Sequence, residues 1–269
     1  MSQPLSYKIG ILGTGRMGEA ILDTILKSGF NGSNIVISDR RVERVKELSK
    51  KYNCYFLAAE EIAKSAQDIL LVVKPQDVDG LLESIGKKIS VGQRVISFAA
   101  GKKTSSIENY LVEGVPVLRV MPNTPMSVGV GASAISAGKY ATAEDVKAVE
   151  ELLNASGKTI VVDESLQDAV TATSGSGPAY FFRFVEAMIA GAQDLGLSEK
   201  DAHTLVVQTI TGAAAMLSVE GADPAVLRQN VTSPNGTTFA ALQVFERGDL
   251  EGLIKRAMTA ARDRSQELS

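Results

Sequence analysis

Two stretches of the sequence combine residue types that can bind small anionic ligands. Near the N-terminus, Gly13, Gly15 and Gly18 recur with the spacing G-x-G-x-x-G, and such a loop brings backbone N–H groups up to a phosphate. Near the C-terminus, residues 230–238 read NVTSPNGTT and place four hydroxyls around a turn. A helix is expected to begin at the end of this turn, where free N–H groups suit a carboxylate. A plain capped turn is the alternative.

The sequence around the glycine loop supports a dinucleotide site. An apolar run of strand character, residues 8–12, precedes the loop, and an amphipathic stretch, residues 19–27, follows it. In a strand–loop–helix unit of this kind, Gly13 permits the tight turn, Gly15 lets backbone approach a pyrophosphate, and Gly18 lets the helix pack closely on the strand. This context favours a nucleotide-binding loop over a merely structural one.

The end of the second strand-like run bears on which dinucleotide fits. Residues 34–38 end at Asp39, about the twenty residues downstream at which the motif expects an acid for the ribose hydroxyls. Asp39 favours NADH, because its charge would repel a 2′-phosphate. Arg40 and Arg41, with Arg16 in the loop, could instead clamp that phosphate. These residues leave NADPH and NADH both open.

The pattern of apolar residues divides the chain into a sheet-forming part and a helical part. Alternation of strand-like and helical runs predicts an α/β fold with a Rossmann-type parallel sheet in residues 1–163, followed by an all-α domain in residues 164–269. The expected strands are 8–12, 34–38, 69–73, 94–98, 115–120, 132–137 and 158–162, and the expected C-terminal helices are 179–195, 201–219, 224–229, 239–245 and 250–267. Residues 72–75 and 97–101 then lie at the carboxyl ends of strands, where open α/β sheets bind ligands.

Composition argues against several classes of protein. The 269-residue chain is 45% hydrophobic, which is enough for a large core, and its net charge of −3 offers no basic surface for nucleic acid or an anionic membrane. The only cysteine, Cys54, cannot form an internal disulfide, and we expect no signal peptide or membrane-spanning segment. The single histidine, His203, argues against a histidine-based metal site. We therefore expect a cytoplasmic protein without a bound metal.

Taken together, the motifs make the chain resemble the pyrroline-5-carboxylate reductases over nearly its whole length. Besides the glycine loop, the resemblance rests on the segments VKP (73–75), AAG (99–101), MPNTP (121–125) and SGSGPAY (174–180), and on the S-P-x-G-x-T turn. Many dehydrogenases share the glycine loop, whereas SGSGPAY and the turn are far more specific to this family. Asn235 departs from the family, which usually has glycine there, but asparagine tolerates left-handed backbone angles. A second departure is Ala58-Ala59, where relatives often place an asparagine near the adenosine ribose.

The resemblance implies roles for particular residues. The backbone of the turn would hold the substrate carboxylate, and the Thr238 hydroxyl would hydrogen-bond the ring nitrogen and serve as the catalytic group. The implied substrate contacts are Glu164, Ser176, Gly177, Ser233, Gly236, Thr237 and Thr238. The implied cofactor contacts are Gly13, Thr14, Gly15, Arg16, Met17, Gly18, Ser38, Asp39, Arg40, Val72, Val73, Lys74, Pro75, Ala99, Ala100, Met121, Asn123 and, from the partner subunit in a homodimer or a higher homo-oligomer of dimers, Asn230. Family precedent favours NADPH, with NADH accepted.

The residues that are missing also bear on the chemistry. Ketone reduction normally uses a proton donor, and the β-hydroxyacid dehydrogenases, similar in outline, rely on a lysine in the first long helix of their second domain. No lysine occurs here between Thr159 and Glu199. A protonated cyclic imine is already electrophilic, so its site need only align the ring and hold its carboxylate. We expect reduction of 1-pyrroline-5-carboxylate to L-proline; a related imine or 2-hydroxyacid dehydrogenase and a non-catalytic dinucleotide-binding relative are the alternatives.

Overall fold

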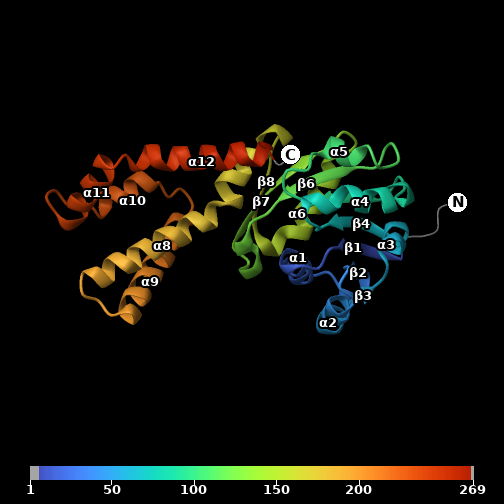
Figure 1. Cartoon of the computed structure of the whole chain (residues 1–269), viewed down its shortest axis with the longest axis horizontal. Coiled ribbons are helices and arrows are strands. Elements are labelled where there is room, and N and C mark those ends of the chain that lie inside the picture. The colour runs from blue at the N-terminus through green and yellow to red at the C-terminus, as the bar shows by residue number, and fades with distance from the viewer. Residues whose placement is uncertain (1–5, 268–269) are drawn as a thin grey trace. The chain divides into compact units, whose positions relative to one another are not determined.

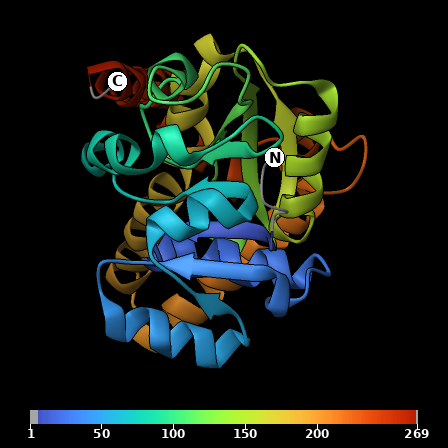
Figure 2. The ribbon, with the colours of Figure 1, turned by 90° about the vertical axis from the view of Figure 1, so that its right-hand side faces the viewer.

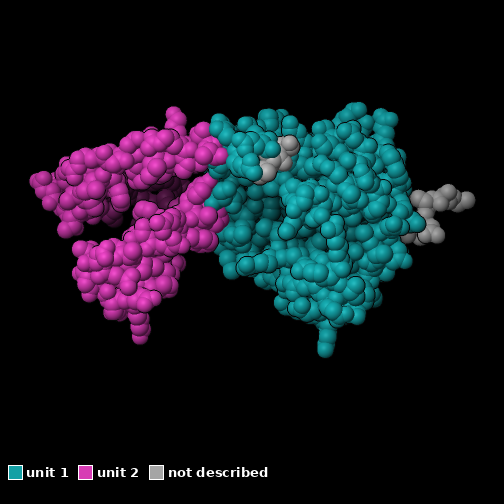
Figure 3. Space-filling view, viewed as in Figure 1, with its two compact units in different colours: residues 1–176, 261–269 teal, residues 177–260 magenta. Residues whose placement is uncertain are grey.

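The computed structural model describes residues 6–267, which form two compact units (Figures 1 and 3). Within the described residues, unit 1 comprises residues 6–176 and 261–267, and unit 2 comprises residues 177–260. The boundary between the units thus falls within the SGSGPAY segment. The functional division expected at residue 163 stays a prediction.

Unit 1 contains an eight-stranded sheet with the strand order β3-β2-β1-β4-β5-β6-β7-β8. The strands are β1 (Tyr7–Leu12), β2 (Ile35–Ser38), β3 (Tyr55–Phe56), β4 (Ala66–Leu71), β5 (Arg94–Ser97), β6 (Val117–Met121), β7 (Gly131–Ala137) and β8 (Gly157–Val161). Neighbouring strands run parallel, except that β6 and β7 are antiparallel. The predicted α/β class with a largely parallel Rossmann-type sheet is confirmed.

Helices cover both faces of this sheet (Figure 2). They are α1 (Arg16–Lys27), α2 (Val42–Tyr52), α3 (Ala59–Ser65), α4 (Pro75–Ile85), α5 (Thr104–Glu108), α6 (Ala143–Leu153) and α7 (Gln167–Val170). On one face, Ile21 and Ile25 of α1, one helical turn apart, are fully buried in the same cluster as Ile11 of the sheet. On the other face, Val78 and Leu82 of α4 are buried in a second cluster. Each such side chain contributes about 1.5–3 kcal/mol by its burial, so the sheet is held in a fixed shape.

Three details of the sheet differ from the expectation. Strand β7 is antiparallel to β6, because the short link between them holds only a 3₁₀ turn, Thr124–Val128, whereas a parallel link needs a crossover of a dozen or more residues. The short edge strand β3 was not expected, since two residues give no periodic signal. Strand β4 begins at Ala66 instead of residue 69, and it therefore includes the charged Asp68, which is buried there and pairs with Arg94 of β5 at 2.6 Å.

Unit 1 ends in a segment of short helical pieces. A 3₁₀ turn, Glu164–Leu166, leads into α7 and then into a π-helical turn, Thr171–Gly175. The π-helical turn is closed by the N–H of Ser176, which donates to the Thr171 carbonyl at 2.8 Å. Such turns occur often at functional sites, and no local pattern in the sequence predicted this one.

Unit 2 is helical, as expected, and its helices bury few side chains. It contains α8 (Gly177–Asp194), α9 (Glu199–Leu217), α10 (Pro224–Asn230), α11 (Thr237–Arg247) and the first part of α12 (Leu250–Glu267). Its buried residues within the described chain are Gly177, Ala202 and Val206. Phe181 and Phe182 of α8 are 63% and 62% exposed. No helix within residues 6–267 is long and apolar enough to cross a membrane.

Candidate functional site

The glycine loop joins β1 to α1, and its three glycines do different things. Gly13 has φ +103°, and a Cβ there would lie 2.5 Å from the Val72 carbonyl oxygen. A Cβ on Gly18 would lie 2.1 Å from the carbonyl oxygen of Gly13, whereas one on Gly15 would meet no described atom within 4 Å. Gly13 and Gly18 are therefore required by the packing of the loop itself. Gly15 leaves open space over the backbone at the start of α1.

A hollow of about 600 Å³ opens beside this loop, at the carboxyl ends of β1, β2 and β4. Of the predicted cofactor contacts, it is lined by Gly13, Gly15, Ser38, Asp39, Arg40, Val72, Val73 and Lys74. The other lining residues are Leu12, Arg41, Ala59, Gln76, Asp77 and Leu81. Gln76 and Asp77 lie in the first turn of α4, directly after Lys74 and Pro75. Because they follow a strand that ends at this edge of the sheet, their place in the hollow could have been predicted from the sequence.

Asp39 lies in the charged wall of this hollow, and its carboxylate is already engaged. Oδ2 accepts from the N–H of Thr14 at 2.8 Å and from its hydroxyl at 3.1 Å. Oδ1 accepts from the N–H and the Nε of Arg41, both at 3.0 Å. Burial alone would raise the pKa of Asp39, but the hydrogen bonds from Arg41 and Thr14 hold this pKa well below its usual range. Asp39 thus braces the glycine loop against the start of α2, whereas its position in the sequence predicted only a contact with the ribose hydroxyls.

Two further arginines lie near the loop. Arg40 Nη1 is 3.0 Å from Asp77 Oδ1, but the Arg40 side chain is 82% exposed, so this ion pair is weak and the guanidinium can reorient. Arg44 of α2 donates from Nε to the Thr14 carbonyl at 3.3 Å and pairs with Glu19 in the first turn of α1. Arg40 is therefore available to a ligand, whereas Arg44 ties the loop to α2.

Several predicted cofactor contacts near the loop do not line the hollow. Thr14 is fully buried, and Met17 packs against the core of unit 1. Arg16 begins α1 as an exposed residue, and Pro75 begins α4. Their contacts with a cofactor stay predictions.

Four further predicted cofactor contacts, Ala99, Ala100, Met121 and Asn123, lie at or after the ends of β5 and β6, which are neighbours in the sheet. Ala99 and Ala100 lie in the turn after β5, where Ala99 is buried and Ala100 exposed. Asn123 follows β6; its Nδ2 donates to the Ser174 carbonyl at 3.1 Å, and its Oδ1 accepts from the Ala132 N–H at 2.9 Å. The Asn123 amide therefore links the π-helical turn to the start of β7 within unit 1.

Glu164, predicted as a substrate contact, also makes its contacts within unit 1. Its Oε1 accepts from the N–H of Thr104 at 2.8 Å, and its Oε2 accepts from the hydroxyl of Thr104 at 2.7 Å. Arg119 Nη1 lies 3.6 Å from Oε1. Ser176 and Gly177 follow at the end of the π-helical turn and the start of α8.

The hydroxyl-rich turn of unit 2 joins α10 to α11. Asn235 has φ +60°, the left-handed conformation that glycine usually supplies, so the turn forms despite this departure from the family. The Gly236 N–H donates to the Ser233 carbonyl at 3.0 Å, and Thr232 donates its hydroxyl to the Arg228 carbonyl at 2.7 Å. Among the described residues, no side chain caps α11, which begins at Thr237. Its first N–H groups can therefore receive an anion.

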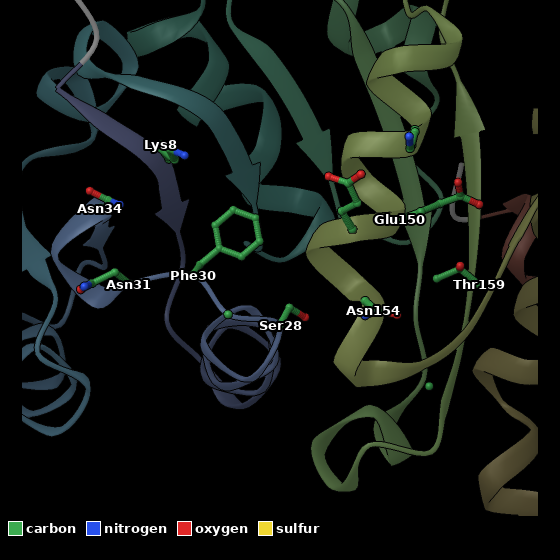
Figure 4. A pocket seen from close by; sticks show the side chains of 12 residues that line it. Lys8, Ser28, Phe30, Asn31, Asn34, Glu150, Asn154 and Thr159 are labelled. Carbon is green, nitrogen blue, oxygen red and sulfur yellow. The ribbon is translucent and has the colours of Figure 1, made fainter.

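A second hollow, of about 770 Å³, lies near the amino ends of β1 and β2 (Figure 4). Lys8 of β1 and Asn34 lie on one side of it, and Glu150 and Asn154 come from the α6 region on the other, with the ring of Phe30 between them. Open α/β sheets bind ligands at the carboxyl ends of their strands. This larger hollow is therefore not the dinucleotide site.

Comparison with known proteins identifies the family. Residues 164–268 match the family described as pyrroline-5-carboxylate reductase dimerisation, and residues 8–101 match the family described as NADP oxidoreductase, coenzyme F420-dependent. The pyrroline-5-carboxylate reductase of Methanosarcina acetivorans is 41% identical over 265 residues, which cover 98% of each chain. The chain belongs to the pyrroline-5-carboxylate reductase family.

Solved structures from this family share the fold. A pyrroline-5-carboxylate reductase from Coxiella burnetii has a TM-score of 0.90 and 34% identity, and the match covers 98% of this chain and 99% of that one. The pyrroline carboxylate reductase of Plasmodium falciparum, solved with NADP bound, has a TM-score of 0.85 and 27% identity over 99% of each chain. The predicted family is thereby confirmed.

The hollow in unit 1 fits the nicotinamide dinucleotide that this family implies. In the described chain, no side chain caps α1 at Gly15, and the open space over Gly15 admits a phosphate to these N–H groups. Ala59, at the second departure from the family, lines the hollow without a polar group. Within residues 6–267, no group of three or more His, Cys, Asp or Glu side chains is placed to hold a metal ion.

Proposed function

We propose that the protein reduces 1-pyrroline-5-carboxylate to L-proline, the last step of proline biosynthesis. The observation that carries this proposal is the match to the family along the whole chain, including the turn at residues 233–238. The open glycine loop and the uncapped start of α11 support it, because they offer one site for a pyrophosphate and one for a small carboxylate.

The proposed reaction needs few catalytic side chains. When bound, the reduced nicotinamide supplies a hydride to the carbon of the C=N bond, and the nitrogen, which arrives protonated, becomes the amine as the nicotinamide is oxidised. The backbone from Ser233 to Thr238 holds the substrate carboxylate. The Thr238 hydroxyl hydrogen-bonds the ring nitrogen and keeps its proton in place. Correct alignment then supplies most of the rate.

The variant Thr238→Ala tests the assignment of the turn. Purified wild-type protein with NADPH and 1-pyrroline-5-carboxylate should form proline, and the variant should lose about 100-fold in kcat/KM, since one positioned hydrogen bond to the reacting group is removed. Cofactor affinity, measured by quenching of NADPH fluorescence, should stay within 2-fold or so of wild type because the glycine loop is untouched. Loss of NADPH binding in the variant would refute the assignment. Oxidation of hydroxyacids without imine reduction by the wild type would refute the function.

We propose that NADPH is preferred and NADH accepted. Asp39 is paired with Arg41, so its charge opposes a 2′-phosphate less than a free carboxylate would. Arg40 is exposed and lines the same hollow, and a solved relative, from Plasmodium falciparum, carries NADP. Kinetics with both cofactors test this point. Arg40→Ala should lower kcat/KM for NADPH by about 10-fold and leave that for NADH nearly unchanged, because a phosphate–arginine contact is removed.

We further propose a cytoplasmic homodimer, or a higher homo-oligomer of such dimers. Residues 164–268 match a family described as a dimerisation domain, and the exposed phenylalanines of α8 provide an apolar surface for a second copy. In this proposal residues 1–163 bind the dinucleotide, residues 164–269 bind substrate and the second copy, and Asn230 reaches the partner's cofactor. The buried free thiol of Cys54 suits a reducing compartment.

A further inference from the structure

One segment of unit 1, residues 164–176, contacts Thr104, which follows the turn carrying Ala99 and Ala100, and also Met121 and Asn123 at the end of β6; we call it the bridge segment. At its start, the Glu164 carboxylate accepts hydrogen bonds from the N–H and from the hydroxyl of Thr104. Thr104 is the first residue of α5, so it directly follows the turn at residues 98–103. Both atoms that bind Glu164 belong to a residue that is only 4% exposed. Glu164 therefore fixes one end of the turn that carries Ala99 and Ala100.

The other end of this turn is fixed by the sheet. The Phe98 N–H donates to the Leu71 carbonyl at 2.9 Å, which continues the pairing of β5 with β4. Between the two fixed ends, Gly101 has φ +75° and the Lys102 N–H donates to the Ala99 carbonyl at 3.4 Å. The turn is thus fixed at one end by the sheet and at the other by Glu164, and Lys102 Nζ donates from its middle to Asp79 Oδ2 of α4 at 2.8 Å.

The buried Arg119 also holds Glu164 in place. The Arg119 side chain is 3% exposed. In the sheet, Arg119 of β6 is paired with Ser97 of β5 on one side and with Ser136 of β7 on the other. Its Nη1 is 3.6 Å from Glu164 Oε1, and among the described residues its Nη2 has no hydrogen-bond partner. A guanidinium buried this deeply needs a negative charge nearby, so moving Glu164 away would be costly.

The far end of the bridge segment holds the neighbouring turn. Asn123, after β6, donates to the Ser174 carbonyl at 3.1 Å. The methyl carbon of Met121 lies 2.6 Å from the place where a Cβ of Gly175 would be, so Met121 packs directly against the backbone of this segment, and a side chain at Gly175 would displace its end. Between the two ends, Gln167 Nε2 donates to Ser136 Oγ at 2.8 Å, which anchors the middle of the segment to β7.

From these contacts we infer that Glu164 is a positioning residue for hydride transfer and not a substrate contact. Each of its carboxylate oxygens already accepts a hydrogen bond from Thr104, and the buried Arg119 is its ion-pair partner within the described chain. Through Thr104, Glu164 sets the turn that carries Ala99 and Ala100, and through the rest of the bridge segment that turn is kept in register with Met121 and Asn123. The inference rests on the proposed function, because it assumes that these four residues face the nicotinamide.

Three variants test the inference by steady-state kinetics on the full-length protein. Thr104→Val keeps the Glu164–Arg119 pair and removes one hydrogen bond; kcat should fall about 10-fold, because small displacements of a reacting group are costly. Glu164→Gln should lower kcat by about 100-fold for the same reason, since it also removes the charge beside Arg119. Thr104→Ser keeps the hydroxyl and should retain wild-type kcat. In the first two variants KM for the imine should change by less than about 3-fold, which is the signature of lost transition-state alignment.

A deuterium label distinguishes positioning from a merely structural role. With NADPH deuterated at the transferred position, the isotope effect on kcat should rise in Thr104→Val and Glu164→Gln, because hydride transfer becomes slower than product release. Glu144→Gln, at an exposed glutamate in the first turn of α6, is the matched control and should behave as wild type.

Three results would overturn the inference. An imine KM raised 10-fold or more in Glu164→Gln, with kcat unchanged, would make Glu164 a substrate contact after all. Unchanged kinetics with a lowered melting temperature in both main variants would make its role purely structural. If Glu164→Gln does not fold, wild-type kinetics in Thr104→Val alone would contradict the inference. A wild-type protein that turns over no imine would refute the proposed function instead, and the variants would then have no rate to compare.

Discussion

The two units of the molecule use similar apolar side chains in opposite ways. In unit 1, Ile9, Ile11 and Ile21 are completely buried between sheet and helices. In unit 2, Phe182 is 62% exposed and Leu195 is 89% exposed, and α10 and α11 bury no residue. A chain gains little from apolar side chains that stay in water. Unit 1 therefore contains its own core, whereas the apolar faces of unit 2 need another surface to cover them.

The two candidate ligand sites also differ in how far their own unit holds them in place. In unit 1 the glycine loop is held by five hydrogen bonds from Thr14 and Arg41 to Asp39, and by Arg44 on the Thr14 carbonyl. In unit 2 the start of α11 has no side-chain cap among the described residues, and Thr237 is exposed. The glycine loop of unit 1 is thus held in place by residues of one chain. We expect the turn in unit 2 to gain its final surroundings only on assembly.

The strongest test of this comparison is a charge in the apolar surface of unit 2. Phe182→Asp should raise the dimer dissociation constant by at least about 100-fold, because burial of the phenyl ring is lost and a charge must be desolvated. Sedimentation equilibrium gives the dissociation constant. Val91→Asp, at a residue of unit 1 that is 66% exposed, is the matched control and should change neither mass nor stability. Wild-type assembly in Phe182→Asp would mean that this face of α8 stays in water.

Two glycine substitutions sharpen the account of unit 1. A methyl group on Gly15 meets no described atom within 4 Å, so Gly15→Ala should leave the melting temperature unchanged but weaken NADPH binding by about 2 kcal/mol, roughly 30-fold, because it fills the space of the phosphate. Gly18→Ala should lower both the melting temperature and the affinity for NADPH, since its methyl would lie 2.1 Å from the Gly13 carbonyl oxygen. Fluorescence titration and thermal unfolding separate the two outcomes. Equal NADPH affinity in Gly15→Ala and wild type would move the pyrophosphate away from this loop.

Helical glycines elsewhere provide the control for these two variants. Gly80 lies in α4, and a Cβ there would meet no described atom within 4 Å. Gly80→Ala should therefore keep NADPH binding and stabilise the fold by up to about 1 kcal/mol, because alanine favours a helix. A loss of NADPH binding here would show that the loop variants act indirectly.

The smallest expected effect concerns Cys54 in the core of unit 1. Burial raises the pKa of this thiol to about 11, whereas an unfolded cysteine has a pKa of about 8.5. The neutral thiol is thus favoured in the folded state, and its contribution to stability is full below about pH 8.5 and is lost as the pH rises towards 11. Near pH 9.5 the loss should be about 1 kcal/mol relative to neutral pH.

Urea unfolding at several pH values measures this loss. Cys54→Ala cannot ionise at this position, so the difference in unfolding free energy between wild type and variant should shrink as the pH rises from 8 to about 10. A difference that is constant with pH would mean that the folded thiol titrates normally and is open to solvent.

Much of the fold could be predicted because local patterns and global architecture agree. Residues 8–12 and the glycine loop form one continuous signal, and helix α12 begins and ends where its apolar periodicity predicts. The antiparallel β7 and the two-residue β3 could not be predicted, because pairing direction and edge strands depend on neighbours distant in the chain. The π-helical turn at residues 171–175 likewise has no established residue pattern.

In the candidate site, too, some features could be predicted from the sequence and others depend on the fold. The sequence alone determined the ligand classes, since the spacing of Gly13, Gly15 and Gly18 and the crowded hydroxyls before α11 are local properties of the chain. Only the tertiary structure decided what the charged side chains do. Asp39 braces a loop, and Glu164 holds Thr104 beside a buried Arg119, because hydrogen-bond partners 25 and 60 residues apart meet only when the sheet and its helices pack. A carboxylate's chemical type can be read from sequence, but its partners are set by the fold.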